Sequence, residues 1–149
     1  QPDLVQRQLM EVHYRIYAAP QYIKEHGLPR TVEELDDHRL VIYGEDAAPP
    51  VANLNWLLEM GAGETPRRPA LKINNIYGIY RAVRSGIGIG ALPDYMTGHA
   101  EDLVQILPEL EGPGFNTYFV YPQELRNSKR IGVFRDFLVN RIRQDQVNA

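Results

Sequence analysis

The 149-residue sequence contains no cysteine, so disulfide bonds, thiolate catalysis and cysteine-ligated metal sites are excluded together. A chain without cysteine is compatible with a reducing compartment, and we expect the cytoplasm. Four histidines remain as possible metal ligands, namely His13, His26, His38 and His99. No two of them have the i, i+4 spacing of a helical metal site. We therefore expect no bound metal and no cofactor.

Long apolar runs are also missing. No stretch approaches the length that spans a bilayer and no signal peptide opens the sequence, so we expect no membrane partner. The formal net charge is −3, which argues against nucleic-acid binding by the chain as a whole. The basic residues after Ser128 are interrupted by Asp136 and Asp145, and a solvent-exposed helix face explains them better than a nucleic-acid contact.

Residue patterns typical of catalysis are scarce. The serines are Ser85 and Ser128, and neither lies in the G-x-S-x-G motif of a nucleophile elbow. Neighbouring carboxylates occur at predicted helix starts and in loops, where helix-dipole complementarity and solvation account for them. We therefore predict that the chain is not an enzyme.

The stretch 69–94 organises the rest of the predicted fold. Residues 71–73 alternate between apolar and polar, as in a strand, and residues 76–84 carry apolar side chains at helical spacing. Residues 87–93 alternate isoleucine with glycine and end in a proline, which cannot donate to a sheet ladder. Strand, helix and strand form a βαβ crossover, which implies a parallel pair in an α/β sheet.

Asn74 and Asn75 stand where the helix of this crossover begins. Asparagine is a favoured N-cap, and the first-turn N–H groups of a helix attract anions because they lack partners inside the helix. Ligands of open α/β sheets bind outside the carboxyl ends of the strands, which is where the two asparagines lie. The residues alone leave two interpretations open: an anion site, or a cap that only faces water.

Gly86, Gly88 and Gly90 form a G-x-G-x-G run. A dinucleotide-binding fingerprint needs its glycines between a strand and the start of a helix, whereas these follow a helix and lead into a strand. We therefore predict that they let a neighbouring helix or backbone come close.

The remaining elements are predicted from apolar periodicity and from turn and cap residues. Residues 54–60 fit either a helical turn or a strand, and we interpret them as a hairpin with Trp56 packed against it. The other predictions are an extended connector over 4–10, a strand over 13–18, a helix from Pro20 to Gly27, a short helix with a Thr31–Glu34 capping box, a strand over 40–43, a loop over 44–53, a helical turn over 95–100, strands over 103–107 and 118–121, and an amphipathic helix from Ser128.

Three motifs carry a family resemblance when they are taken in this order: Y-A-A-P-Q-Y-I-K-E-H-G-L-P-R-T-V-E-E-L-D-D-H-R-L at 17–40, I-N-N-I-Y-G-I-Y-R-A-V-R-S-G-I-G-I-G-A-L-P-D-Y at 73–95, and Y-F-V-Y-P-Q-E-L-R-N-S-K-R-I-G-V-F-R-D-F-L at 118–138. With them the chain resembles the effector-binding domain of LysR-type transcriptional regulators from about residue 4 onwards. The order is specific, although no single motif would be.

The resemblance implies a fold of the α/β class, similar to type 2 periplasmic binding proteins, with an effector between two subdomains. On this basis the chain would be a partial effector-binding domain: residues 10–122 form the second subdomain, 1–9 a crossover segment, and 123–149 the returning helix of the first subdomain. The helix-turn-helix and the first half-subdomain of the family have no counterpart in these residues, so DNA would be bound only through that N-terminal domain.

Carried over by position, the effector-binding wall falls at Asn74, Asn75 and Ile76 and at Leu92 and Pro93. The resemblance implies a small polar or anionic metabolite as the effector. A solute-binding protein, or the ligand-binding part of an enzyme with the same fold, is the alternative.

The last predicted helix has one further implication. Its apolar residues Ile131, Phe134, Leu138 and Ile142 share one face, and in the family that helix packs on the first subdomain. Without that cover, Ile131, Phe134 and Leu138 would be exposed, which favours self-association as a dimer or a swapped arrangement.

Overall fold

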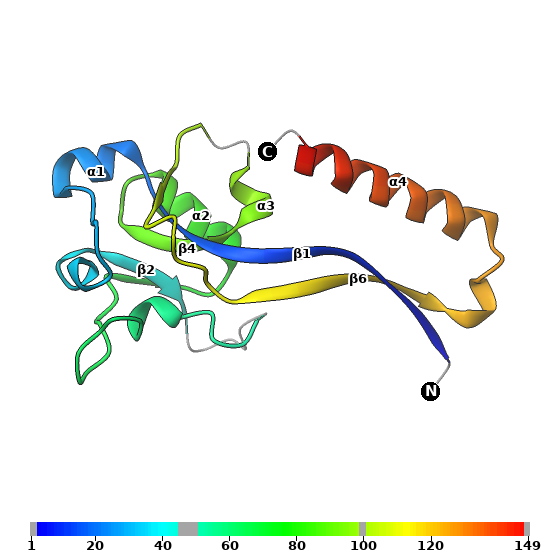
Figure 1. The fold of residues 1–149 in the computed structure, drawn as a ribbon, viewed down its shortest axis with the longest axis horizontal. Helices are drawn as coiled ribbons and strands as arrows, with labels where there is room; N and C mark the ends of the chain where they lie inside the picture. Colours follow the sequence, from blue (N-terminus) through cyan, green and yellow to red (C-terminus); the bar gives the residue numbers. More distant parts are fainter. Residues whose placement is uncertain (1–2, 45–50, 99–100, 148–149) are drawn as a thin grey trace. The chain divides into compact units, whose positions relative to one another are not determined.

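The computed structural model describes residues 3–44, 51–98 and 101–147, and the chain divides into two compact units (Figure 1). One unit joins Gln1–Val12 to Gly114–Ala149, and the other is His13–Pro113. Almost all buried apolar side chains belong to His13–Pro113. No helix within the described ranges is long and apolar enough to cross a membrane.

A sheet with the strand order β3-β2-β4-β1-β5 forms the centre of the His13–Pro113 unit. Its strands are β1 (Leu4–Ala18), β2 (Leu40–Tyr43), β3 (Leu71–Ile73), β4 (Ile89–Pro93) and β5 (Val104–Ile106). Strand β2 runs parallel to both β3 and β4, whereas β1 runs antiparallel to β4 and β5. The predicted α/β class is confirmed. The two strands of the βαβ crossover are parallel as predicted, but β2 lies between them.

Helix α2 (Ile76–Arg84) follows β3 as predicted and packs on the sheet. Asn75 Oδ1 accepts a hydrogen bond from the backbone N–H of Gly78 at 2.6 Å, so the predicted N-cap is confirmed. On the inner face Ile79 and Val83 are buried. A Cβ atom at Gly90 would lie 2.7 Å from Val83 Cγ2, which confirms that the glycine lets the helix approach the strand.

Strand β1 differs from its prediction. We expected an extended connector followed by a strand, but one continuous strand covers Leu4–Ala18. Helix α1 (Pro20–His26) then begins at Pro20, as predicted, and ends at Gly27, whose φ of 86° favours glycine. Tyr22 faces the core from this helix.

The segment between α1 and β3 contains two further differences. Residues Glu33–Asp37 form a 3₁₀ helix, and Glu34 accepts from the backbone N–H of Arg30, so the predicted Thr31–Glu34 capping box is wrong. The predicted hairpin over 54–60 is also wrong, because Trp56–Leu58 form a 3₁₀ turn. Trp56 is buried, as predicted, but it packs over Gly112, where a Cβ atom would lie 2.6 Å from Trp56 Cζ2.

One short helix completes the described part of this unit. Helix α3 (Asp94–Thr97) follows Pro93, and Leu107, whose φ is 47°, follows β5. The predicted loop over 44–53 and helical turn over 95–100 extend into 45–50 and 99–100, which lie outside the described residues, as does His99.

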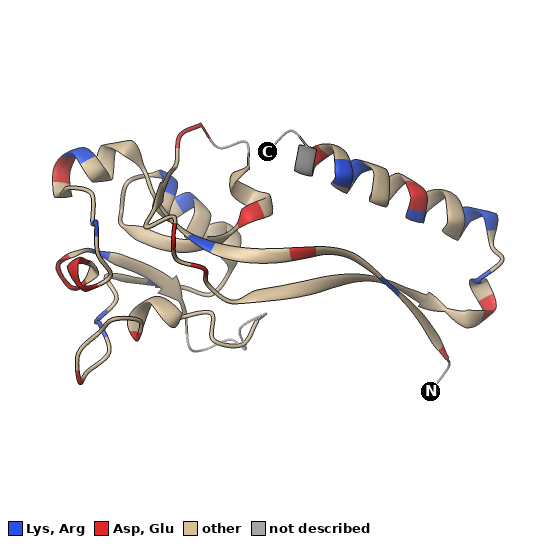
Figure 2. Cartoon of the chain, in the orientation of Figure 1, with Lys and Arg blue, Asp and Glu red and all other residues tan. Residues whose placement is uncertain are grey.

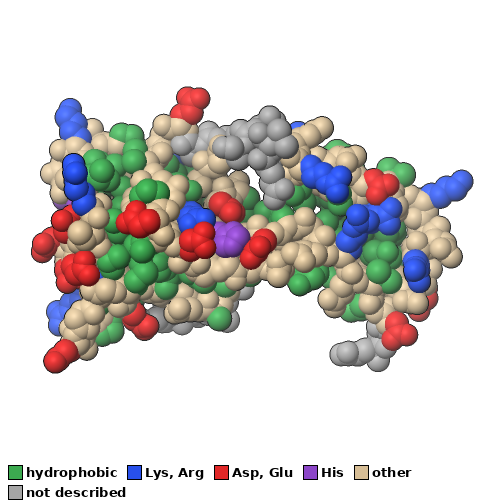
Figure 3. Space-filling model, in the orientation of Figure 1, with side chains coloured by type: hydrophobic (Ala, Val, Ile, Leu, Met, Phe, Trp, Pro, Cys, Tyr) green, Lys and Arg blue, Asp and Glu red, His purple; other side chains and the backbone are tan. Residues whose placement is uncertain are grey.

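The other unit consists of the N-terminal half of β1, strand β6 (Gly114–Pro122), a 3₁₀ turn over Gln123–Leu125 and helix α4 (Lys129–Val147). The Thr117 hydroxyl donates to the Met10 carbonyl at 3.1 Å, and Gln8 Nε2 donates to Asn116 Oδ1, across the β1–β6 pair. Lysine and arginine positions recur along the ribbon of α4, interrupted by acidic ones (Figure 2). Apolar side chains show on the same unit between these charges (Figure 3).

The amphipathic character of α4 is weaker than predicted. Ile131, Leu138 and Ile142 are only half-buried, and Phe134 is 53% exposed although its ring lies 5.8 Å from that of Phe119. Beside Phe134, two large apolar side chains that the sequence reasoning did not single out are even more exposed: Val133 at 72% and Phe137 at 62%. No described residue of α4 is fully buried.

Candidate functional site

The carboxyl ends of three parallel strands meet at one edge of the sheet. Strand β3 ends at Ile73, β2 at Tyr43 and β4 at Pro93, and the pairings of β2 with β3 and with β4 align these ends. The backbone N–H of Gly44 donates to the Ile73 carbonyl at 3.0 Å, so the chain leaving β2 stays beside the start of the Asn74–Asn75 turn. In open α/β sheets this is the edge at which ligands bind.

The predicted site residues divide into two groups at this edge. Asn74 and Asn75 are exposed and Ile76 is half-buried, so the N-terminal end of α2 is accessible from outside. Leu92 is fully buried and Pro93 is also buried, at the end of β4. Since β2 separates β3 from β4, the structure places the two groups at the same edge but not side by side.

Hydrogen bonding at the cap limits what Asn75 can offer a ligand. Its Oδ1 already accepts from Gly78, and its Nδ2 is left as a side-chain donor. The backbone N–H groups of Ile76 and Tyr77 likewise have no acceptor within the helix. The end of α2 therefore presents donors that suit a carboxylate, a carbonyl or a phosphate oxygen.

Asn55 fixes the end of β2 in a way that sequence reasoning missed. Its Oδ1 accepts from the backbone N–H of Tyr43 and its Nδ2 donates to the Tyr43 carbonyl, both at 3.0 Å. The side-chain amide thus takes the place of a neighbouring strand. Local periodicity does not reveal such a contact, because Asn55 lies 12 residues from Tyr43.

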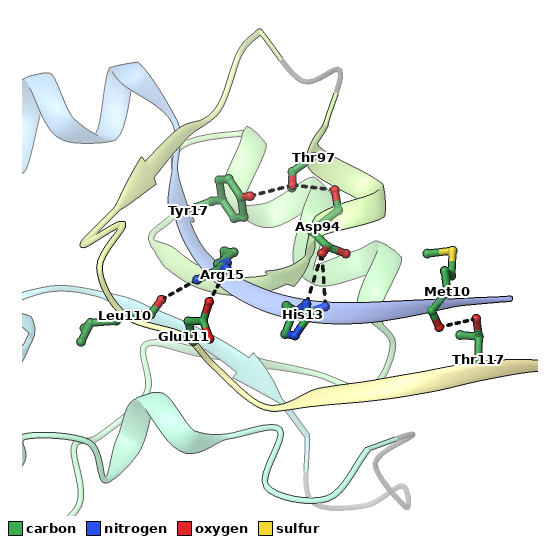
Figure 4. Close-up of polar contacts among 9 residues, drawn as sticks. All are labelled: Met10, His13, Arg15, Tyr17, Asp94, Thr97, Leu110, Glu111 and Thr117. Atoms are coloured by element: carbon green, nitrogen blue, oxygen red, sulfur yellow. Dashed lines mark hydrogen bonds and ion pairs between the residues drawn. The ribbon is translucent and has the colours of Figure 1, made fainter. Parts of the chain in front are cut away.

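Strand β1 brings further polar groups to the edge, because Tyr14 pairs with Pro93 in the antiparallel register. The neighbouring His13 donates its backbone N–H to Asp94 Oδ2 at 3.3 Å, and its Nδ1 lies 3.8 Å from the same oxygen (Figure 4). The Thr97 hydroxyl bonds to the Tyr17 hydroxyl at 2.8 Å and to the Asp94 carbonyl at 3.1 Å. These contacts hold α3 against β1.

Arg15 ties the segment after β5 to the same strand. Its Nη1 donates to the Leu110 carbonyl at 3.3 Å and its Nη2 to Glu111 Oε1 at 2.8 Å (Figure 4). The sequence offered one signal for these groups: Asp94 directly follows the strand-ending Pro93, at a carboxyl end. Nothing local indicated that His13 and Arg15 would face them.

The buried Tyr14 pairs with Pro93 at this edge. Tyr14 is 2% exposed, and its burial, with smaller contributions from Tyr95 and Tyr43, raises the pKa of Tyr14 to about 12. The phenol therefore stays protonated and can donate a hydrogen bond near neutral pH. Within the described ranges, no three His, Asp or Glu side chains lie close enough together to hold a metal ion.

Comparison with known proteins finds relatives that are described as transcriptional regulators. The family described as LysR substrate binding domain matches residues 1–143. A probable HTH-type transcriptional regulator, LtrA of Klebsiella pneumoniae, is 32% identical over 115 residues, which are 74% of this chain and 36% of that protein. The chain spans less than half the length of the curated relatives it matches.

Solved structures with the same fold include two regulatory domains. That of CrgA, a LysR-type transcriptional regulator from Neisseria meningitidis, has a TM-score of 0.74 and 27% identity, with 93% of this chain and 68% of that chain covered. The regulatory domain of AphB in Vibrio vulnificus has a TM-score of 0.66 and 27% identity, with 92% of this chain and 69% of that chain covered.

Proposed function

Since this chain belongs to the LysR substrate binding domain family, we propose that it senses a small polar or anionic metabolite for a LysR-type transcriptional regulator. The binding wall that we propose consists of the Asn74–Ile76 turn and of Leu92 and Pro93 at the end of β4. The relatives are regulators, which favours sensing over catalysis and over the solute-binding alternative.

One observation carries this proposal: the N-terminal end of α2 is exposed at the edge where β2, β3 and β4 end. Backbone and side-chain donors are present there, at the cap residue Asn75 and in the first turn of α2. An anion at that position would be stabilised by the helix dipole and by first-turn N–H groups.

In the complete regulator, we propose, the effector shifts the equilibrium between arrangements of two subdomains, and the change reaches DNA through an N-terminal domain. The division into a crossover segment (1–9), a second subdomain (10–122) and a returning helix (123–149) belongs to this proposal. The compact unit His13–Pro113 supports the middle segment. A DNA-bound regulator would act in the cytoplasm.

Substitutions at Asn75 test the binding wall. We expect a small carboxylate at about 100 times its dissociation constant to raise the melting temperature of the chain by roughly 5–10 °C. Asn75→Ser keeps an N-cap and should retain most of this shift. Asn75→Asp also keeps a cap but adds a negative charge, so the shift should be lost. A thermal-shift screen of mono- and dicarboxylates measures all three proteins.

The pair of variants separates capping from binding. Both have favoured N-cap residues, so a difference between them reflects the added charge at the site and not helix stability. Equal shifts in wild type and both variants would remove Asn75 from the site. The same screen on a longer regulatory domain then shows whether the binding wall needs the rest of the domain.

Self-association is the second part of the proposal. Val133, Phe134 and Phe137 form an exposed apolar patch on α4, which we call the α4 patch, and Lys129 and Arg130 line the same groove. The unit to which α4 belongs contains few buried apolar residues, among them Val12 and Tyr121. A helix and a two-stranded ribbon need further cover to be stable, and a second copy would supply it.

Charges in the α4 patch should dissociate such a dimer. We expect light scattering at high protein concentration to give about twice the monomer mass for the wild type and the monomer mass for Val133→Glu/Phe137→Glu. Both side chains are exposed, so the double variant should fold. Leu28→Glu, at an exposed apolar residue of the other unit, is the control and should stay dimeric. A wild type that is cleanly monomeric contradicts this part of the proposal.

A further inference from the structure

Tyr22 lies between two histidines at the junction of α1 and β2. It is completely buried, and its ring stacks on that of His26 at 4.4 Å with an interplanar angle of 9°. Its hydroxyl accepts a hydrogen bond from the backbone N–H of Arg39 at 2.9 Å and lies 3.0 Å from His38 Nδ1. Arg39 in turn leads directly into β2. One phenol thus links α1 to the start of the strand.

The directions of these hydrogen bonds depend on the charge of His38. A backbone N–H can only donate, so the Tyr22 oxygen accepts from Arg39 and its single proton is available for His38 Nδ1. That bond requires Nδ1 without a proton, which means a neutral imidazole. If His38 became protonated, Nδ1 would turn into a donor and the Tyr22 proton would lose its acceptor in a buried position.

We propose that Tyr22 and His38 form a pH-sensitive latch, which holds α1 to the start of β2 while His38 is neutral and releases it when His38 is protonated. The latch is independent of the effector-binding edge, because none of its residues belongs to that edge. Its consequence is local: acid should loosen the segment from α1 to Arg39 before the sheet unfolds.

Charged groups around His38 act in both directions. Burial lowers the pKa of His38, a positive charge on His26 lowers it further, and the carboxylates of Asp37 and Glu34 partly oppose this. Burial also raises the pKa of Tyr22. The phenol therefore keeps its proton when His38 is protonated, and two donors then face each other. The backbone N–H and the charge of Arg39 lower the pKa of Tyr22, but burial has the larger effect.

The sign of the pH dependence follows from the lowered pKa. When the pH is above the pKa of histidine in the unfolded chain, His38 is neutral in both the folded and the unfolded protein, and the latch contributes its full stability. As the pH falls below that value, the unfolded state binds the proton more readily. The contribution is therefore lost as the pH falls through the pKa of His38 in the folded state.

Hydrogen exchange on the full chain tests the latch. We expect the protection factors of the backbone amides in segment 20–39 of the wild type to fall roughly fivefold or more between about pH 7.5 and pH 5.5. The factors are corrected for the pH dependence of intrinsic exchange rates. His38→Asn keeps an acceptor near the Nδ1 position but cannot titrate, so its protection should not change with pH. His13→Asn removes a histidine elsewhere and should behave as the wild type.

A double-mutant cycle and an NMR titration complete the test. Tyr22→Phe and His38→Ala, each of which removes the bond, should show a coupling free energy near neutral pH, and the same cycle should show none in acid, where His38 is protonated. If either variant fails to fold, the titration of wild-type His38 decides alone. A proton on Nδ1 at neutral pH, an ordinary histidine pKa, or pH-independent protection of 20–39 would each overturn the proposal.

Discussion

Replacing Arg67 with methionine is expected to lower the free energy of unfolding by about 3 kcal/mol. The Arg67 side chain is only 5% exposed, and its guanidinium donates to the carbonyl oxygens of Val32, Leu57 and Met60 while it pairs with Asp36. Methionine has a similar length but no donor, so the carbonyls of Leu57 and Met60 would lose the Arg67 donor, and that of Val32 would keep only the N–H of Leu35. The loss corresponds to a fall of roughly 6–12 °C in the melting temperature.

Equilibrium urea unfolding measures this effect, and two further variants locate it. Arg67→Lys keeps the charge but not the planar fork of donors, and should lose most of the same stability. Arg68→Met changes the adjacent, exposed arginine and should have an effect within about 0.5 kcal/mol. If Arg67→Lys were as stable as the wild type, the charge and not the set of carbonyl contacts would be responsible.

Gly88→Ala is expected to destabilise the protein by about 2–3 kcal/mol. A Cβ atom at Gly88 would lie 2.4 Å from the Arg39 carbonyl oxygen, which is backbone and cannot move aside as a side chain would. The same carbonyl accepts the N–H of Ile89 at 2.8 Å, so a displacement would strain the pairing between β2 and β4. The melting temperature and the urea concentration at the unfolding midpoint should therefore both fall.

Gly63 offers the matched control for this substitution. A Cβ atom there would meet nothing within 4 Å, so Gly63→Ala should be neutral or slightly stabilising. The two changes add the same methyl group in the same unit and differ only in the space available. If both variants were similarly stable, the Arg39 carbonyl could move away from the added methyl group with little loss in the free energy of unfolding.

The local parts of the fold were predicted well because their signals lie close together in the sequence. The N-cap at Asn75, the start of α1 at Pro20 and its end at Gly27 each depend on one residue and its immediate neighbours. The close helix–strand approach at Gly90 could also be predicted, since alternating glycines remove from a strand the side chains that would keep a helix at a distance.

Contacts between distant segments account for the failures. Residues 54–60 have apolar spacing that fits more than one structure, and contacts with other segments, such as those of Arg67 with Leu57 and Met60, favour the 3₁₀ turn over a hairpin. The insertion of β2 between β3 and β4 depends on pairing across the chain. The 3₁₀ turn has Val32 and not Thr31 as its N-cap residue, and Glu34 accepts from the backbone N–H of Arg30 instead.

The candidate site was predictable only in outline. The sequence placed Asn74 and Asn75 at the carboxyl end of a strand, and the structure shows them exposed there. It gave no indication of the Tyr43–Asn55 pairing or the contact of His13 with Asp94. Both contacts join residues from different elements. The binding roles of Asn74, Asn75 and Ile76, and those of Leu92 and Pro93, stay predictions for the thermal-shift screen.

The uneven distribution of buried residues determines what an unfolding experiment reports. The single tryptophan, Trp56, is buried in the His13–Pro113 unit, so its fluorescence follows the loss of that core alone. Far-ultraviolet circular dichroism receives a large part of its helical signal from α4, which has no described residue in a core. The two signals should therefore change at different denaturant concentrations, and a stability quoted for this protein refers to one unit or the other.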